Sequence, residues 1–116
     1  MLDARESAKR NGLAGNARFL LGDAAQELPR LARAGERFAA AILDPPRRGA
    51  DERVLRALLD AAPERIAYIS CDPATLARDL KALTAGGYRL QFAQPVDMFA
   101  YTGHVEAVTL LQRRAL

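Results

Sequence analysis

The sequence predicts an α/β fold, with a mostly parallel β-sheet that ends in an antiparallel pair of strands. Apolar runs of strand length alternate with segments whose apolar residues recur at helical spacing. Gly, Asn and Asp residues stand where these segments end. The last two strand-like runs have no helix between them, so they should pair antiparallel. A chain of 116 residues is long enough for one domain with a modest core.

The first half of the chain predicts two helices and two strands. They are a helix at 3–11 that stops at Asn11-Gly12, a short strand at 17–21, a helix after Gly22-Asp23 that runs to about Ala34, and a strand at 38–43. Gly35 is the expected cap of the second helix. The run at 38–43 is continuously apolar, which is typical of a parallel strand buried on both faces.

The second half predicts two more helices and three more strands. They are a helix at 51–61, a strand at 65–70, a helix from 73 to about 85, and strands at 88–96 and 105–112. Asp72 is a good N-cap for the helix that follows it, and Pro73 is favoured at the first helical position. Gly86-Gly87 should end that helix.

Composition excludes several classes of protein. A single cysteine rules out an internal disulfide, and one cysteine with one histidine does not make a structural zinc site. No signal-peptide pattern opens the sequence, and no apolar run reaches the roughly 18 residues of a membrane span. We therefore expect a cytoplasmic protein with no membrane partner. The net charge of +3 is too small to establish a nucleic-acid partner.

Three polar segments should meet at one edge of the predicted sheet. Asp44 and Cys71 both follow parallel strands, whose carboxyl ends share an edge. The last strand runs the other way, so its beginning, with His104 and Glu106, reaches the same edge. The order of the elements alone can therefore bring Asp44, Cys71 and Glu106 together.

Each of these residues also has an ordinary structural interpretation. An isolated intracellular cysteine is usually buried and inert. A helix N-terminus after Cys71 favours a thiolate, while an ionised Asp72 beside it disfavours one, and the sequence does not rank the two effects. Glu106 can be a solvated strand charge, and His104 a hydrogen-bonded structural histidine.

The other candidates have similar alternatives. Asp44 can simply end a strand before a Pro-Pro turn, and Asp23 can be only an N-cap. Arg47, Arg48 and Arg78 are candidate phosphate contacts, with solvated surface arginines as the alternative.

Three motifs in order resemble those of a known family. They are Asp-Pro-Pro-Arg-x-Gly at 44–49, Ser-Cys-Asp-Pro-Ala-Thr-Leu-Ala-Arg-Asp at 70–79 and Asp-Met-Phe-x-x-Thr-x-His-Val-Glu at 97–106. The chain resembles the RNA uracil-C5 methyltransferases, which use S-adenosylmethionine to methylate uridine in tRNA or rRNA. The resemblance covers nearly the whole chain but only the later part of that family's catalytic domain. It implies that 1–116 is the C-terminal portion of an incomplete Rossmann-like class I methyltransferase sheet.

The resemblance also implies roles for six residues. Cys71 falls on the nucleophile, Glu106 on the base that removes the C5 proton, Asp44 and Asp23 on cofactor-binding residues, and His104 and Thr102 on supports for the substrate. In this chemistry a thiolate adds to C6 of uracil and makes C5 electron-rich enough to accept a methyl group. A base then removes the C5 proton, so the chemistry needs one cysteine, one carboxylate and hydrogen-bond donors near O4 of the uracil, and no metal.

The beginning of the sequence departs from the family. The family's earlier strand, its Gly-rich loop and the acidic residue that holds the cofactor ribose have no counterpart here, and Gly12 and Gly15 do not make G-x-G-x-x-G. We therefore expect a part of a longer enzyme that by itself binds S-adenosylmethionine poorly and has marginal stability.

Three alternatives stay open. The first is a catalytically incompetent remnant that binds RNA or protein. The second is a cysteine hydrolase that pairs Cys71 with His104. The third is an amino-methyltransferase with Asp-Pro-Pro-Tyr, although Arg47 here replaces the aromatic residue.

Overall fold

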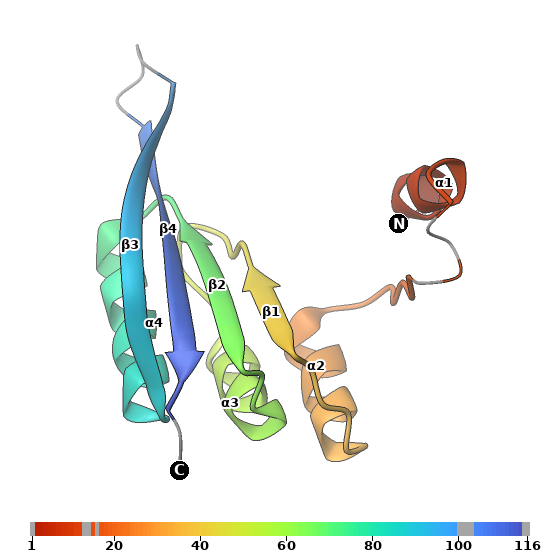
Figure 1. The fold of residues 1–116 in the computed structure, drawn as a ribbon, viewed down its shortest axis with the longest axis horizontal. Helices are drawn as coiled ribbons and strands as arrows, with labels where there is room; N and C mark the ends of the chain where they lie inside the picture. The colour runs from red at the N-terminus through yellow and green to blue at the C-terminus, as the bar shows by residue number, and fades with distance from the viewer. Residues whose placement is uncertain (1, 13–14, 16, 100–103, 115–116) are drawn as a thin grey trace.

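The computed structural model describes residues 2–12, 15, 17–99 and 104–114. The elements of this part, in chain order, are α1 (Leu2–Arg10), α2 (Ala24–Arg33), β1 (Ala40–Leu43), α3 (Glu52–Ala61), β2 (Arg65–Ser70), α4 (Pro73–Ala85), β3 (Tyr88–Phe99) and β4 (His104–Arg113) (Figure 1). No helix in these ranges is long and apolar enough to cross a lipid bilayer.

The strands form one mixed sheet in the order β1-β2-β4-β3. β1 and β2 are parallel, and β4 runs antiparallel to both β2 and β3. The predicted α/β class and the antiparallel C-terminal strand pair are therefore confirmed. β4 lies between β2 and β3, so the last strand of the chain enters the sheet rather than extending its edge.

The predicted strand at 17–21 does not form. These residues are irregular, and Leu21 is 82% exposed. A strand is stable only when its backbone groups pair with a neighbour, and residues 17–21 pair with no strand among the described residues. Their absence from the sheet leaves β1–β2 as its parallel pair, so the described sheet is less parallel than expected.

β1 differs from the prediction in its burial. The apolar run at 38–43 suggested a strand covered on both faces, but Ile42 is 76% exposed. Ala41 and Leu43 alternate with it and pack towards the helices. β1 is therefore an edge strand of the described sheet and is covered on one face.

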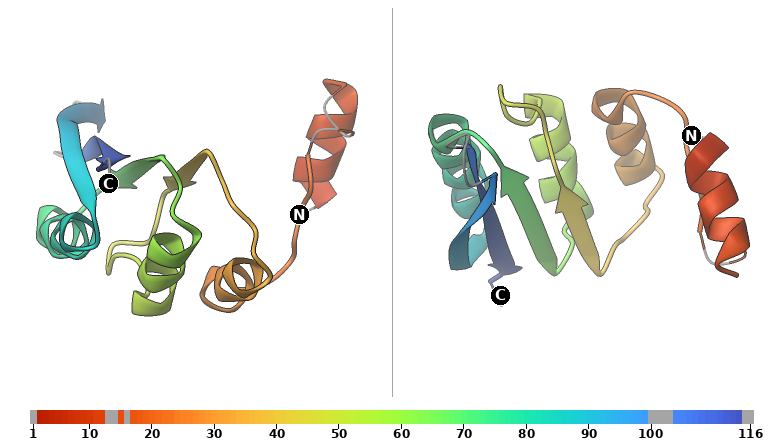
Figure 2. Two further views of the ribbon diagram at one scale, coloured as in Figure 1. Left: turned by 60° about the horizontal axis from the view of Figure 1, so that its bottom comes forward. Right: turned by 90° about the horizontal axis from the view of Figure 1, so that it is seen from above.

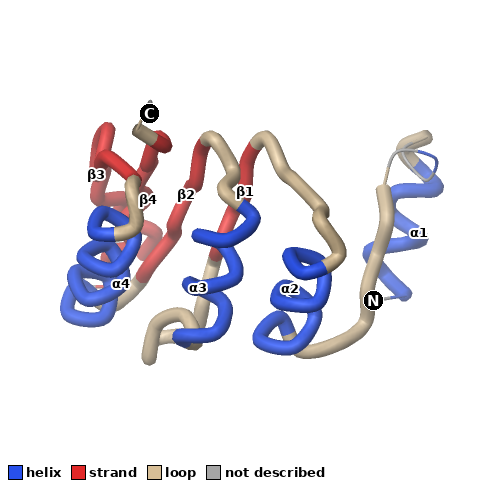
Figure 3. Tube along the Cα trace, turned by 90° about the horizontal axis from the view of Figure 1, so that it is seen from below, coloured by secondary structure: helices blue, strands red, loops and turns tan. Residues whose placement is uncertain are grey.

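The helices α2, α3 and α4 lie side by side on the same face of the sheet (Figures 2 and 3). The core lies between the two layers and comes mainly from the buried residues Leu55, Ile66, Tyr68, Leu76, Leu83, Tyr88 and Leu111. α1 lies away from the sheet, beyond the β1 edge (Figure 1). In the part of the chain that the structure describes, no helix covers the opposite sheet face, where Ile42 is exposed.

Each of the three packed helices begins at an aspartate that caps it. Asp23 accepts a hydrogen bond from the amide of Ala25 at 3.0 Å, and Asp51 accepts one from Arg53 at 2.8 Å. Asp72 begins α4 in the same way, with Pro73 in the first turn as predicted. These caps satisfy amides that have no partner within the helix. The caps therefore fix the residue at which each of these helices begins.

Candidate active site

The strand pairings bring three candidate residues to one edge of the sheet. Leu43, the last residue of β1, pairs with Tyr68 near the end of β2, and Asp44 follows it. β2 ends at Ser70, which pairs with Ala107 near the beginning of β4. The topology therefore confirms that the carboxyl ends of β1 and β2 and the start of β4 share an edge.

Cys71 and Glu106 flank the last pair of the β2–β4 ladder. Ser70 pairs with Ala107; Cys71 follows the first of these residues and Glu106 precedes the second. If the register continues by one position, Cys71 stands opposite Glu106. Residues opposite each other in an antiparallel pair share a face, with Cα atoms about 4.5–5.5 Å apart. Both residues are half-buried.

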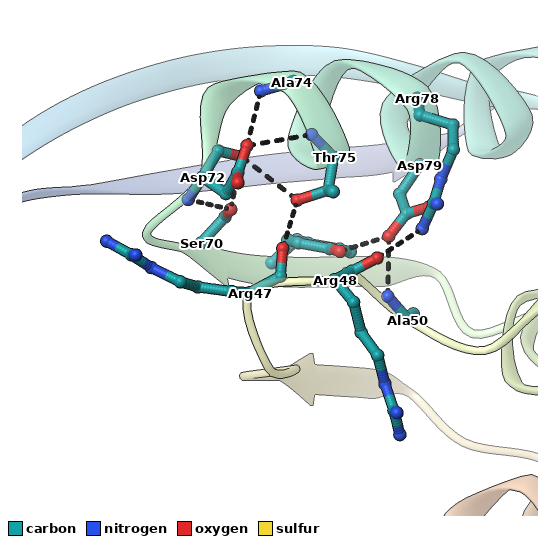
Figure 4. A network of polar contacts seen from close by, with 10 residues as sticks. Arg47, Arg48, Ala50, Ser70, Asp72, Ala74, Thr75, Arg78 and Asp79 are labelled. Atoms are coloured by element: carbon teal, nitrogen blue, oxygen red, sulfur yellow. Dashed lines mark hydrogen bonds and ion pairs between the residues drawn. The ribbon is translucent and has the colours of Figure 1, made fainter.

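The backbone on either side of Cys71 is held by a small set of hydrogen bonds. The Ser70 Oγ donates to the Asp72 carbonyl at 3.0 Å and accepts from the Asp72 amide at 3.1 Å. The Asp72 carboxylate accepts from the amides of Ala74 at 2.9 Å and Thr75 at 3.3 Å (Figure 4). The carboxylate beside the cysteine is therefore bound to the start of α4, and Cys71 lies between two fixed residues.

Asp23 and Asp44 line the same pocket, which has a volume of about 380 Å³. Both side chains are exposed, and Asp23 also caps α2. Asp23 is therefore an N-cap, and this role is compatible with its place in the pocket wall. Apolar and charged side chains complete that wall, among them Ile42, Leu43, Pro45, Pro46, Arg48 and Val54.

The resemblance assigns two residues to substrate support, and they lie either at the limit of the described residues or outside them. Thr102 lies outside them. His104 is the first residue of β4, where it pairs with Phe99 of β3. Glu106 follows two residues later and pairs with Val96.

A buried carboxylate that the sequence analysis missed lies behind this edge. Asp79 is 1% exposed and accepts hydrogen bonds from the Tyr68 hydroxyl, the Ala50 amide at 2.8 Å and the Arg78 Nε at 3.1 Å. Arg78 also donates to the Arg48 carbonyl at 2.9 Å. The guanidinium of Arg78, a candidate phosphate contact, therefore makes hydrogen bonds inside the protein, although its side chain is 59% exposed. The sequence signal that could have revealed Asp79 is its position on the apolar stripe of α4, between Leu76 and Leu83.

The two largest buried side chains, Tyr68 and Tyr88, should make stability fall at alkaline pH. Burial raises the pKa of both phenols, and the bond to Asp79 raises that of Tyr68 further. A raised folded pKa stabilises the protein below the unfolded value, about 10, and this contribution is lost as pH rises towards the folded pKa. Above pH 10 the free energy of unfolding should therefore fall, by at most about 1.4 kcal/mol per pH unit for each tyrosine.

Urea unfolding between pH 8 and 11 measures this slope. Tyr68→Phe should make the slope shallower, although it also lowers stability at pH 8 by about 1–3 kcal/mol because Asp79 loses a buried donor. Tyr88→Phe is the corresponding variant at the second tyrosine. It removes the hydroxyl that donates to the Pro63 carbonyl. If neither substitution changed the slope, the loss of stability at alkaline pH could not be assigned to these two tyrosines.

The fold of the chain is that of the methyltransferases. The tRNA (uracil-54, C5)-methyltransferase of Pyrococcus abyssi, solved in complex with S-adenosyl-L-homocysteine, superposes with a TM-score of 0.74 and 33% identity. The match covers 93% of this chain and 24% of that one. Fibrillarin of Methanococcus jannaschii, a pre-rRNA processing protein, shares only the fold, with a TM-score of 0.56 and 18% identity.

The family model of the tRNA (uracil-5-)-methyltransferases matches residues 28–114, so the chain belongs to that family. An RNA methyltransferase of Gloeobacter violaceus is 53% identical over 110 residues, and one of Halalkalibacterium halodurans is 46% identical over 110 residues. Each alignment covers 95% of this chain but only 23% and 24% of the relatives. The chain thus spans about a quarter of the length of the relatives it matches.

Proposed function

We propose that this chain supplies the nucleophile and the base of an S-adenosylmethionine-dependent uridine-C5 methylation of tRNA or rRNA, within a longer enzyme. The observation that carries the proposal is the position of Cys71 and Glu106, one residue beyond the last pair of the β2–β4 ladder. A thiol and a carboxylate at neighbouring positions of one sheet edge are the pair that this chemistry needs.

The Cys71 thiolate adds to C6 of the uridine, and the electron pair of the C5–C6 double bond moves onto the C4 carbonyl oxygen. C5 then acts as the carbon nucleophile that accepts the methyl group. Glu106 takes the C5 proton. The electron pair of that C–H bond restores the C5–C6 double bond, and the thiolate leaves.

The pocket beside Asp44 fits the methyl donor. Asp23 and Asp44 offer carboxylates for the amino and hydroxyl groups of S-adenosylmethionine, and Ile42 and Val54 offer apolar surface for its adenine ring. When bound, S-adenosylmethionine supplies the methyl group. Asp44 follows β1 directly, so it links this pocket to the sheet edge that carries Cys71.

Two observations support a longer enzyme. The chain spans about a quarter of its relatives. The sheet face opposite the helices also exposes large apolar side chains, with Ile42 and Phe92 being 76% and 47% exposed. Such surfaces are normally covered by further protein.

A second candidate function is a remnant without catalysis that binds RNA or protein. The irregular conformation of residues 17–21 favours it, because this segment leads into Asp23 and the pocket wall. The two functions differ in whether Cys71 forms a bond with uridine.

Covalent trapping on RNA that contains 5-fluorouridine tests the proposed function. Because a base cannot remove fluorine as it removes a proton, a true enzyme remains bound through Cys71 after methyl transfer. We suggest two samples: the 116-residue chain alone, and a hybrid in which the chain replaces the matching 110 residues of the Gloeobacter relative. Each is incubated with S-adenosylmethionine and the RNA, and adducts are resolved on denaturing gels.

The hybrid should form an adduct that peptide mapping assigns to Cys71, and the chain alone should form little or none. If the intact Gloeobacter relative formed the adduct and the hybrid did not, the result would favour the remnant without catalysis. Rapid adduct formation by the isolated chain would overturn the proposal that it needs a longer enzyme.

A further inference from the structure

The loop between β1 and α3 is attached to α4 through its backbone. This loop, residues 44–50, begins with Asp44, while α4 begins two residues after Cys71. The loop and the helix come from different parts of the chain, yet three residues of α4, namely Thr75, Arg78 and Asp79, bind the loop (Figure 4).

Three hydrogen bonds make this attachment. The Thr75 Oγ1 donates to the Arg47 carbonyl at 2.8 Å. The Arg78 Nη2 donates to the Arg48 carbonyl at 2.9 Å, and the Ala50 amide donates to the Asp79 Oδ2 at 2.8 Å. All three use loop backbone, so the side chains of Arg47 and Arg48 stay exposed and point away from α4 (Figure 4).

Gly49 shows how closely the loop approaches the helix. Its φ of +89° is a conformation that residues with a Cβ rarely adopt. A Cβ at this position would lie 2.4 Å from the Arg78 Nη2 and 2.8 Å from the Asp79 Oδ2. The loop and α4 are therefore in direct contact, with no room for a side chain between them.

Asp79 connects this attachment to the sheet. Its buried carboxylate also accepts the Tyr68 hydroxyl, and Tyr68 is fully buried two residues before the end of β2. A buried carboxylate with this many donors favours one arrangement, because any partner left unpaired costs free energy. The position of the loop is thus set relative to the strand and helix that flank Cys71.

We propose that Thr75, Arg78 and Asp79 are positioning residues that hold the Asp44 loop at a fixed place relative to Cys71. The proposal rests on the proposed function, because it assigns these residues to the same reaction. They touch the loop backbone and not the reacting atoms. Their effect is to keep the pocket of Asp44 aligned with the Cys71 thiol, and a misplacement of about 1 Å in such a site can lower a rate by about a hundredfold.

Substitutions at Thr75 separate positioning from general packing. In the hybrid, Thr75→Val removes the hydroxyl but keeps the shape, and Thr75→Ser keeps the hydroxyl. Thr84→Val is the matched control, because that hydroxyl donates to the Lys81 carbonyl three residues earlier, as the Thr75 hydroxyl also does to the Asp72 carbonyl at 3.3 Å. The rate of adduct formation at saturating RNA should fall about tenfold in Thr75→Val and by less than about twofold in the other two. The affinity for RNA should stay unchanged.

Arg78→Gln provides a second variant if Thr75→Val does not fold, with Arg56→Gln on α3 as its exposed control. Amide hydrogen exchange of residues 47–50 in the 116-residue chain gives a readout that does not need catalysis. Thr75→Val and Arg78→Gln should speed exchange in this segment, while the controls should not.

The possible outcomes separate the two proposals. Equal rates in Thr75→Val and wild type, or an equal loss in Thr75→Ser, would overturn the positioning role. A wild-type hybrid that forms no adduct would overturn the proposed function. Faster exchange in the Thr75→Val chain would then still show that these residues hold the loop.

Discussion

Replacement of Cys71 by alanine is expected to abolish the adduct with 5-fluorouridine RNA and to lower methylation by the hybrid by about a thousandfold or more. Without the thiolate, C5 of uracil is too weak a nucleophile to accept the methyl group, and the 116-residue sequence has no second cysteine to attack C6. The adduct is measured on denaturing gels, and methylation by transfer of labelled methyl groups to unmodified RNA.

The stability and RNA affinity of this variant should change little. Cys71 is half-buried, and the neighbouring hydrogen bonds run between Ser70 and Asp72, so the substitution leaves the turn intact. Cys71→Ser is the conservative variant, and it should also fail because a hydroxyl is a far weaker nucleophile at neutral pH. An alanine variant that still formed the adduct would show that the nucleophile lies elsewhere.

The helices and most strands could be predicted from the sequence because their signals are local. The predicted helix at 51–61 and strand at 65–70 correspond to α3 (Glu52–Ala61) and β2 (Arg65–Ser70). Apolar spacing sets the faces of these elements, and Asp51 and Asp72 mark the helix starts through bonds to amides two residues ahead. Each of these determinants acts within one or two turns of chain.

The two features that were predicted wrongly depend on partners that are far along the chain or absent from the described residues. An apolar run at 17–21 has strand propensity, but a strand needs a neighbour with free backbone groups. The burial of β1 likewise depends on which layers cover the sheet, and Ile42 has no helix over it among the described residues. Neither condition can be predicted from the local sequence pattern.

The candidate site shows the same contrast between features that could be predicted from the sequence and features that depend on distant residues. Strand order predicted that Asp44, Cys71 and Glu106 share an edge, because the carboxyl ends of parallel strands meet there. The attachment of the Asp44 loop to α4 was missed, because Ala50 and Asp79 are 29 residues apart and no periodicity links them. The chemical roles of the three edge residues stay predictions that the variants test.

Glu106→Gln should give the opposite signature to Cys71→Ala. The amide is isosteric but cannot take up the C5 proton, so the methylated uridine should stay bound to Cys71. On ordinary uridine RNA the wild-type hybrid turns over and accumulates little adduct, whereas this variant should accumulate it. Product release should slow by about 10²–10⁴-fold, the usual contribution of a general base.

Glu64→Gln is the matched control for this experiment. Glu64 precedes β2 at the far end of the strand from Cys71, and its side chain is exposed. This control should turn over like the wild type. On 5-fluorouridine RNA, Glu106→Gln should still form the adduct, because nucleophilic attack precedes the step that needs the base. Loss of that early adduct would instead assign Glu106 to the attack of Cys71 on the ring, and a double variant with Cys71→Ala should form no adduct on either RNA.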